Sequence, residues 1–273
     1  MKGCPLSCRW CSNPESINPY PDLMTYDLRC VLCGRCVKVC SKKAITVDKI
    51  RKIDRLRCDL CLKCVHVCPT GAIKAAGQFM TIEEVLSEVK KDELFYQNSG
   101  GGVTISGGEP LLQWKFVRRL LKKCQQEGFH TALDTSGYAQ WDIFRKVLEY
   151  TDLCLYDLKH TEPGSHTWGT GKSNRRIIEN LYLTASRART WLRVPIIPQY
   201  NDSKEDIMNL ISIAKKSNVE KVSLLPYHDY AKGKYRSLGR YYRFEQLNPP
   251  GNDYLQRLGK PFWNAKINVT IGY

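Results

Sequence analysis

Eight cysteines in a duplicated pattern constrain this sequence more than any other feature. The stretch CVLCGRCVKVCSKKAI begins at Cys30 and the stretch CDLCLKCVHVCPTGAI begins at Cys58, an offset of 28 residues. All four cysteines and the closing Ala-Ile of the two copies coincide. Cysteines in a C-x-x-C-x-x-C-x-x-x-C rhythm are typical ligands of iron–sulfur clusters. The repeat therefore predicts a metal-binding unit with internal twofold symmetry.

The duplicated pattern predicts a ferredoxin-like module with two [4Fe–4S] clusters. In such modules the last cysteine of each run binds the other cluster. One cluster would be held by Cys30, Cys33, Cys36 and Cys68, and the second by Cys58, Cys61, Cys64 and Cys40. Zinc is the alternative, but zinc sites use pairs of C-x-x-C separated by a loop, which leaves this rhythm unexplained. The second run continues with Pro69 and the first with Ser41, a difference that concerns loop shape and removes no ligand.

Three further cysteines stand at the start of the chain, in the stretch GCPLSCRWCSNPES. They are Cys4, Cys8 and Cys11, and the next cysteine along the chain already belongs to the repeat. Three protein ligands leave one position on a metal open, and an open position is usually where chemistry happens. The two remaining cysteines, Cys124 and Cys154, fall in apolar stretches and are expected to be buried as small hydrophobic side chains.

Composition limits the cellular compartment and the class of partner that we expect. The 273 residues include 13 cysteines, with no signal peptide and no apolar run long enough to cross a bilayer. We therefore expect a soluble cytoplasmic protein, in which clustered cysteines are metal ligands rather than disulfides. The net charge is +15, but the basic residues are scattered and no nucleic-acid module is recognisable. This charge indicates either a basic face for an acidic protein partner or simply a lysine-rich solvated surface.

From Phe79 onward, helical and strand-like segments alternate, which predicts an α/β fold with a parallel sheet. The expected helices cover residues 81–97, 110–127, 140–150, 173–187, 203–217 and 252–258. The expected strands cover residues 102–106, 131–135, 153–159, 191–197, 221–227 and 265–272. This rhythm indicates a barrel or a partial barrel, in which ligands collect at the carboxyl ends of the strands.

Chemically unusual residues follow several of these strands. In GVTISGGEPLLQ, the pair Gly107-Gly108 would let the backbone approach a ligand closely, and Glu109 adds a carboxylate. In LYDLK, Asp157 and Lys159 are two residues apart and share one face, where the lysine would meet a carboxylate on a small molecule. Asp134, Thr135 and His228 follow other strands.

Each of these residues also has a plainer interpretation. A Gly-Gly pair is often only a turn, an Asp or Thr at a strand end is often a helix cap, and a lone His is often packing. Their occurrence at successive strand ends, beside a three-cysteine motif with an open position, favours a shared site.

The C-x-x-x-C-x-x-C core of GCPLSCRWCSNPES resembles the cluster motif of the radical SAM superfamily. The stretches SGGGVTISGGEPLLQ, DLK and LLPYH are similar to those of activating enzymes of glycyl radical enzymes, and the inserted cysteine repeat resembles the subgroup that carries a ferredoxin-type domain. The resemblance implies a partial (β/α)6 barrel. It implies three divisions: a cluster loop at 1–24, a ferredoxin-like insertion at 25–78 and the rest of the barrel at 79–273.

The resemblance also implies roles for individual residues. Cys4, Cys8 and Cys11 would hold a third [4Fe–4S] cluster, whose fourth iron binds S-adenosylmethionine (SAM). Around SAM, Trp10 would lie by the adenine, Gly108 and Glu109 by the methionine amino group, and Lys159 and His228 by the methionine carboxylate and the ribose. Asp134, Thr135 and Asp157 would bind a monovalent cation. In the segment HTWGTGKSNRRIIENL, Asn174 would be no more than a helix cap.

The implied activity is reductive cleavage of SAM under anaerobic conditions to a 5′-deoxyadenosyl radical, which installs a glycyl radical on a partner enzyme. A flavodoxin or a ferredoxin would supply the electron, and neither nucleic acid nor membrane is an expected partner. Because relatives carry a first barrel strand before the cysteine motif, we expect the barrel to lack that strand or the reading frame to start upstream. Two alternatives stay open: a radical SAM enzyme for a small molecule, and a simple electron carrier, which would leave Cys4, Cys8 and Cys11 without a role.

Overall fold

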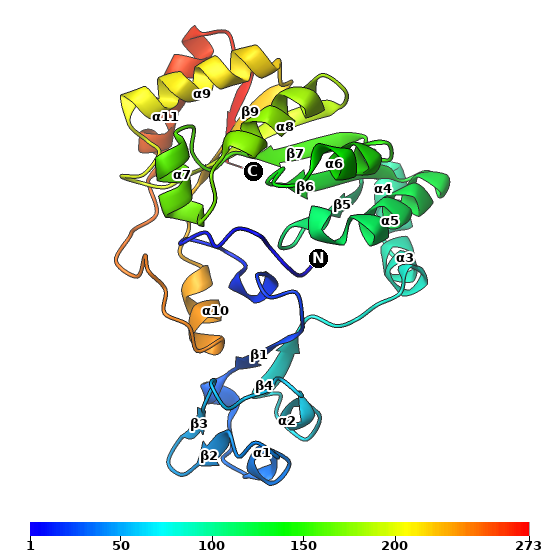
Figure 1. Cartoon of the computed structure of the whole chain (residues 1–273), viewed down its shortest axis with the longest axis vertical. Helices are drawn as coiled ribbons and strands as arrows, with labels where there is room; N and C mark the ends of the chain where they lie inside the picture. The colour runs from blue at the N-terminus through cyan, green and yellow to red at the C-terminus, as the bar shows by residue number, and fades with distance from the viewer. Residues whose placement is uncertain (273) are drawn as a thin grey trace.

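Six parallel strands form the centre of the larger part of the molecule (Figure 1). They are β5 (Gly102–Ile105), β6 (His130–Thr135), β7 (Leu153–Asp157), β8 (Arg189–Ile196), β9 (Lys221–Pro226) and β10 (Val269–Ile271). Their order in the sheet follows the sequence, from β5 at one edge to β10 at the other, and each neighbouring pair is parallel. All six expected strands are therefore confirmed, and all their carboxyl ends lie at one edge of the sheet. The computed structural model describes residues 1–272; Tyr273, the end of the last expected division, lies outside them.

Helices connect the strands, and most of them cover one face of the sheet (Figure 1). They are α3 (Ile82–Lys90), α4 (Glu93–Ser99), α5 (Trp114–Gln126), α6 (Trp141–Leu148), α7 (Pro163–Thr170), α8 (Arg175–Ala185), α9 (Lys204–Ser217), α10 (Ala231–Ser237) and α11 (Asn252–Asn264), with short 3-10 turns η1 (Pro14–Ser16) and η3 (Pro110–Gln113). The expected helix 81–97 is divided into α3 and α4 by a break at Lys91-Asp92, and α7 and α10 were not expected. Among residues 1–272, no helix is both long and apolar enough to cross a membrane.

Alternation along the strands separates a core face from a site face. In β8, Leu192, Val194 and Ile196 are buried against the helices. Because successive side chains of a strand point to opposite faces, Arg193 points to the other side. The core also contains Cys124 and Cys154, both fully buried, which confirms their expected role as small hydrophobic side chains.

The cysteine repeat folds into a separate unit below the sheet in Figure 1, here called the module. It contains β1 (Asp22–Thr25), η2 (Asp27–Arg29), α1 (Arg35–Lys38), β2 (Ile45–Val47), β3 (Arg51–Ile53), α2 (Lys63–His66) and β4 (Ile73–Ala76). β1 pairs antiparallel with β4, and β2 with β3. The expected boundary between residues 24 and 25 falls inside β1. The whole of this strand pairs with β4.

The module is fastened to the rest of the molecule through α10. The carbonyl oxygen of Ser237, the last residue of this helix, accepts hydrogen bonds from Thr25 Oγ1 (3.2 Å) and from Arg55 Nη2 (3.2 Å). Arg240, just beyond the helix, donates to Asp22 Oδ2 at 2.6 Å and to the carbonyl of Pro14 at 2.7 Å. This set of contacts, which we call the α10 joint, ties β1 to both the N-terminal loop and the larger part of the molecule.

Candidate active site

The N-terminal loop that carries Cys4, Cys8 and Cys11 is held in place by backbone hydrogen bonds from both sides. The amide of Ser7 donates to Thr170 in α7 at 2.8 Å, and the amide of Arg9 donates to Gly169 at 3.0 Å. On the other side, the amide of Glu109 donates to the carbonyl of Gly3 at 2.7 Å. The loop thus lies across the carboxyl ends of the strands, which brings its cysteines to the residues that follow those strands.

A cavity of about 480 Å³ lies between this loop and the strand ends. Its wall includes all three loop cysteines together with most of the residues expected from the sequence: Trp10, Gly108, Asp134, Thr135, Asp157, Lys159 and His228. The structure therefore brings together residues that are separated by more than two hundred positions in the sequence. Their convergence makes the plainer interpretation, that each is an unrelated turn, cap or packing residue, the weaker one.

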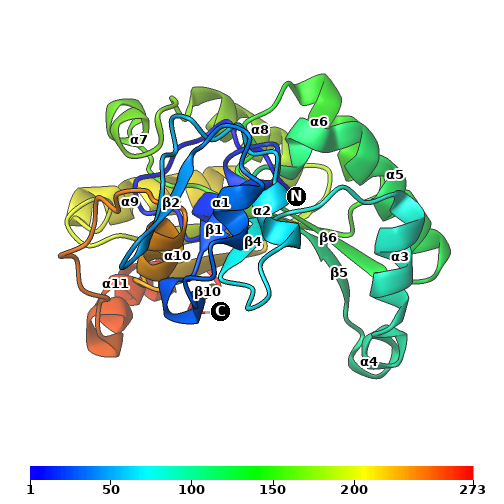
Figure 2. The same cartoon turned by 90° about the horizontal axis from the view of Figure 1, so that it is seen from below.

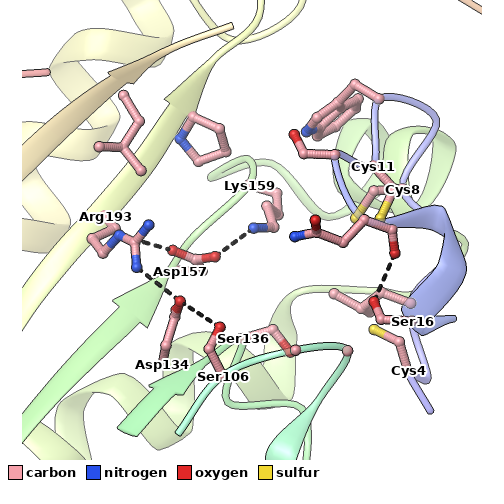
Figure 3. A pocket seen from close by; sticks show the side chains of 18 of the residues that line it. Cys4, Cys8, Cys11, Ser16, Ser106, Asp134, Ser136, Asp157, Lys159 and Arg193 are labelled. Atoms are coloured by element: carbon pink, nitrogen blue, oxygen red, sulfur yellow. Dashed lines mark hydrogen bonds and ion pairs between the residues drawn. The ribbon is translucent and has the colours of Figure 1, made fainter. Parts of the chain in front are cut away.

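A row of alternating charges crosses the cavity floor (Figure 3). Lys159 Nζ lies 2.7 Å from Asp157 Oδ2, and Arg193 Nη1 lies 2.9 Å from Asp134 Oδ2. Arg193 Nε also lies 3.7 Å from Asp157 Oδ1, so the guanidinium bridges the two carboxylates. Ser106 closes the row by donating to Asp134 Oδ2 at 2.9 Å.

Burial and neighbouring charges set the protonation of this row. Burial alone would lower the pKa of Lys159, but the carboxylate of Asp157 and the nearby Cys8 raise it above the ordinary lysine value. Burial and repulsion by Asp157 raise the pKa of Asp134, and the cation of Arg193 acts in the opposite direction. Lys159 is therefore a fixed cation at neutral pH, well placed to attract an anionic group of a ligand.

The thiols of the loop are partly shielded from solvent. Burial raises the pKa of Cys4 to about 11 and that of Cys8 to about 12, and it also raises the pKa of Cys11. Coordination to a metal acts in the opposite direction, because a metal deprotonates the thiol that binds it. Three soft sulfur donors on one cavity wall fit an iron–sulfur cluster better than a site for Mg²⁺ or Ca²⁺, which prefer oxygen ligands.

Glu109 does not line the cavity, in contrast to its expected place beside the amino group of a ligand. Its side chain is fully buried and accepts hydrogen bonds from Leu111 N (3.1 Å) and Thr135 Oγ1 (2.6 Å). It also accepts from Ser136 N (2.9 Å) and Ser136 Oγ (2.6 Å). Because these four donors occupy its carboxylate, Glu109 holds the Thr135-Ser136 loop in position. Burial raises the pKa of Glu109, while these hydrogen bonds oppose the rise.

The two glycines before Glu109 bring the backbone close to the N-terminal loop. A Cβ on Gly108 would lie 2.2 Å from the carbonyl oxygen of Gly3, and a Cβ on Gly107 would lie 2.1 Å from Met1. The expected close approach is therefore made first to the chain's own cysteine loop. Both glycines nevertheless remain on the cavity wall.

Sequence reasoning missed Arg193, Ser106 and Ser136, which also line the cavity. Arg193 lies within the expected strand 191–197, where a charged residue at an alternating position of an apolar strand is itself a signal. Lys234 of α10 was missed because that helix was not expected; its ammonium contacts Asn13 Oδ1 and Glu15 Oε1, each at 2.7 Å. Asn174, expected to be only a cap, is buried and donates from Nδ2 to the carbonyls of His160 (2.9 Å) and Thr161 (2.8 Å).

The eight module cysteines surround two hollows. Cys30, Cys33, Cys36 and Cys68 line one of them, here called the outer hollow. Cys40, Cys58, Cys61 and Cys64 line the other, here called the inner hollow. Each hollow therefore draws its fourth cysteine from the other copy of the repeat, the arrangement typical of two-cluster modules. Among residues 1–272, no three His, Cys, Asp or Glu side chains converge on a point suited to a single metal ion, whereas a four-iron cluster takes its ligands on separate corners.

Comparison with known families and proteins agrees with this geometry. Residues 55–211, more than half of the chain, match the radical SAM superfamily, and residues 29–77 match a 4Fe-4S dicluster domain. The chain is 38% identical to the (2S)-3-sulfopropanediol dehydratase activating enzyme of Klebsiella oxytoca, over 100% of this chain and 90% of that protein. It is 38% identical to the trans-4-hydroxy-L-proline dehydratase activating enzyme of Clostridioides difficile, over 100% and 92% respectively.

A solved structure is similar as well. A domain of a pyruvate-formate lyase-activating enzyme from Bacteroides vulgatus superimposes with a TM-score of 0.54 at 27% identity, covering 63% of this chain and 99% of that one. The chain therefore belongs to the radical SAM superfamily and, within it, to the activating enzymes of glycyl radical enzymes.

Proposed function

We propose that the cavity is where this chain binds SAM beside a [4Fe–4S] cluster held by Cys4, Cys8 and Cys11. The observation that carries the proposal is the presence of these three cysteines on the same cavity wall as the charged row from Asp134 to Lys159. When bound, the cluster and SAM together supply an electron to the sulfonium and a primary carbon radical that removes a hydrogen atom from a glycine of the partner enzyme.

The residues of the chain have separate tasks in this proposal. Lys159, a buried cation, would bind the methionine carboxylate, and the backbone of Gly108 would meet the amino group. His228 would meet the ribose: its ring stacks on Tyr230 with 4.7 Å between centroids, and its Nδ1 is buried without a hydrogen-bond partner. Asp157 Oδ1 is likewise buried without a hydrogen bond, since Arg193 Nε lies 3.7 Å from it. Buried polar atoms of this kind are costly unless a ligand satisfies them.

Trp10 would close the adenine side of the site. It lines the cavity, is 5% exposed, and packs on Tyr200 with 4.7 Å between ring centroids. A rigid aromatic wall fixes the orientation of a planar ring and excludes water from it. Water exclusion matters because a primary carbon radical must meet only its intended substrate.

A monovalent cation at Asp134, Thr135 and Asp157 would have to share its carboxylates with Arg193. The guanidinium already places one positive charge between the two aspartates. We propose that Arg193 neutralises this pair, so that any bound cation is held together with the ligand carboxylate rather than by the protein alone.

The module would add two further [4Fe–4S] clusters, one in each hollow, and would take electrons from a flavodoxin or a ferredoxin. Four cysteines around each hollow support this count of three clusters per chain. Clusters of this type are stable in a reducing, oxygen-free compartment, and the thirteen cysteines of the described residues are all free thiols. We therefore place the protein in the cytoplasm of an anaerobically growing cell.

We propose a glycyl radical enzyme as the partner and assign no substrate to it. Relatives at 35–43% identity are named as activating enzymes of dehydratases, a sulfite-lyase, a trimethylamine-lyase and a decarboxylase. Because this narrow range of identity spans several reactions, we propose the activity as a class: installation of a glycyl radical, with the reaction of the partner left unassigned.

An anaerobic assay with a glycyl radical enzyme encoded beside this chain tests the proposal. With SAM and a reductant, electron paramagnetic resonance should show an organic radical split by one α-hydrogen, and [2-²H]glycine labelling of the partner should collapse the splitting. The matched control is the partner with its loop glycine changed to alanine, which should give no radical. Brisk SAM cleavage without this radical, whatever glycyl radical enzyme is supplied, would mean that the substrate is a small molecule instead.

A further inference from the structure

A groove between α1 and α2 of the module is separate from the cavity. It encloses about 400 Å³ and is lined by Arg35, Lys38, Val39, His66, Val67, Cys68 and Pro69. Both helices lie at the end of the molecule away from the six-stranded sheet, and Figure 2 shows them side by side and facing the viewer. The groove is therefore open to a second protein, and neither the N-terminal loop nor the strand ends reach it.

The groove is basic. Arg35, Lys38 and His66 are all exposed, and residues 30–47 and 60–82 contain no Asp or Glu. Across residues 25–78 there are twelve Lys and Arg against four Asp. Apolar side chains lie between these charges, namely Val39, Val67 and Pro69. A basic rim around a small apolar floor is suited to brief contact with an acidic protein surface.

The groove opens onto a cysteine. Cys68 lines both the groove and the outer hollow, where it lies with Cys30, Cys33 and Cys36. A protein that docks in the groove would therefore come into direct contact with a cluster ligand of the outer hollow.

The inner hollow lies toward the larger part of the molecule. Cys58, which lines it, interacts electrostatically with Arg55, and Arg55 donates to the carbonyl of Ser237 in the α10 joint. Tyr235 of the same helix belongs to a buried cluster with Trp10, and Cys8 of the cavity packs against that cluster. The order in space is therefore groove, outer hollow, inner hollow, α10 joint and cavity.

We propose that the groove between α1 and α2 is the docking site for a small acidic electron-carrier protein, and that electrons enter this chain beside Cys68. The proposal rests on the proposed function, since it assumes that the module holds clusters. One electron moves in each encounter: for a flavin carrier, the anionic hydroquinone is oxidised to the neutral semiquinone, and the centre that Cys68 serves is reduced. No proton or other group is transferred.

Binding of two probes to the anaerobically reconstituted full chain tests the proposal. The probes are a bacterial flavodoxin and a two-cluster ferredoxin, both of negative net charge, titrated by calorimetry at low and high salt. We expect at least one probe to bind, more weakly at high salt. The double variant Arg35→Glu/Lys38→Glu should weaken that binding at least about tenfold, because it reverses the charge of the groove rim.

The matched control is Lys49→Glu/Lys52→Glu, which makes the same change of charge at exposed positions of the module outside the groove. This control should weaken binding less than about twofold, because these charges lie outside the groove and are screened by salt. Iron content should equal that of the parent chain in both variants. Equal weakening by the two double variants, or no binding of either probe, would overturn the proposed docking site.

Cleavage of SAM driven by dithionite separates this proposal from the proposed function. Dithionite is a small reductant and needs no docking surface, so both double variants should cleave SAM at the parent rate. Failure of the parent chain itself to cleave SAM would contradict the proposed function, whereas the binding titrations would still decide whether the groove holds a carrier.

Discussion

The cysteines of the N-terminal loop and those of the module offer the same ligand atoms in different surroundings. Cys8 and Cys11 line the cavity and are partly exposed, and burial raises the pKa of Cys8 to about 12. In the module, Cys36 and Cys64 are buried, but Cys33 and Cys61 are exposed, so each hollow has a ligand at the surface. A radical site must keep solvent out, whereas an electron-transfer site must be reachable by another protein. The comparison indicates that the two regions divide these demands between them.

The largest effect is expected when one cysteine is removed from each region, because the two variants should differ in SAM cleavage. Cys8→Ala should abolish SAM cleavage and lower the iron content from about twelve to about eight atoms per chain. Cys33→Ala should remove a similar amount of iron but leave part of the dithionite-driven cleavage, because the cavity is unchanged. Iron analysis and a chromatographic assay for 5′-deoxyadenosine measure both effects.

Cys124→Ala is the control for these two variants, since it removes a buried thiol that faces neither the cavity nor a hollow. It should keep full iron content and activity. Complete loss of cleavage in both Cys8→Ala and Cys33→Ala would show that the module is obligatory and that the two regions are not separable. Zinc in place of iron would contradict the cluster assignment for the module.

A second prediction concerns the contact between the two regions. Arg240→Ala removes hydrogen bonds to Asp22 and to Pro14, and charge-assisted bonds of this kind contribute about 1.5–3 kcal/mol each. Amides of the β1–β4 pair should then exchange hydrogen about tenfold to a hundredfold faster, since local opening costs less. Hydrogen-exchange mass spectrometry measures this rate.

The control is Arg57→Ala, which removes an exposed ion pair with Asp54 within the module. Exposed pairs of this kind contribute about 1 kcal/mol at most, so exchange in β1 and β4 should be nearly unchanged. Equal protection in Arg240→Ala and the parent would mean that the α10 joint does not hold the module in place.

The smallest effect is expected at Glu109, which lies behind the cavity wall and supports it. Glu109→Gln places an amide nitrogen opposite one of its donors, so one buried hydrogen bond is lost at a cost of about 1–3 kcal/mol. Thermal unfolding of the reconstituted protein should shift to lower temperature by a few degrees, on the order expected for a chain of this size. Glu179→Gln, at an exposed position of α8, is the control and should not shift it. An unchanged midpoint in Glu109→Gln would show that Glu109 does not position the Thr135-Ser136 loop.

The sequence predicted those parts of the molecule that repeat or alternate. The 28-residue offset predicted which cysteines share a hollow, because ligand spacing is a local property of the chain. The positions of the strands were predictable for the same reason, because an apolar run is also a local property of the chain. The strand expected at 153–159 ends at Asp157, however, and Lys159 lies just beyond it with its ammonium 2.7 Å from that aspartate.

Side-chain direction at the strand ends could not be predicted as well. Thr135 and Ser136, which donate to Glu109, lie 26 and 27 positions further along the chain, and no local pattern connects them to it. The bridge from Arg193 to Asp134 and Asp157 likewise depends on the order of β6, β7 and β8 in the sheet. Helix α10 was missed because its sequence, AKGKYRS, contains a glycine and little apolar periodicity, yet it is held by its contacts with the module.

The pairing of β1 with β4 has a consequence for how such proteins gain and lose parts. Asp22 and Ala76 are direct partners in this ladder, so the chain leaves the larger part of the molecule and returns to it at almost the same point. An inserted segment with adjacent ends is tolerated well, since a short turn can join the two ends when the segment is deleted. The module can therefore be exchanged, lengthened or removed in evolution while the strand-end cavity is left geometrically intact.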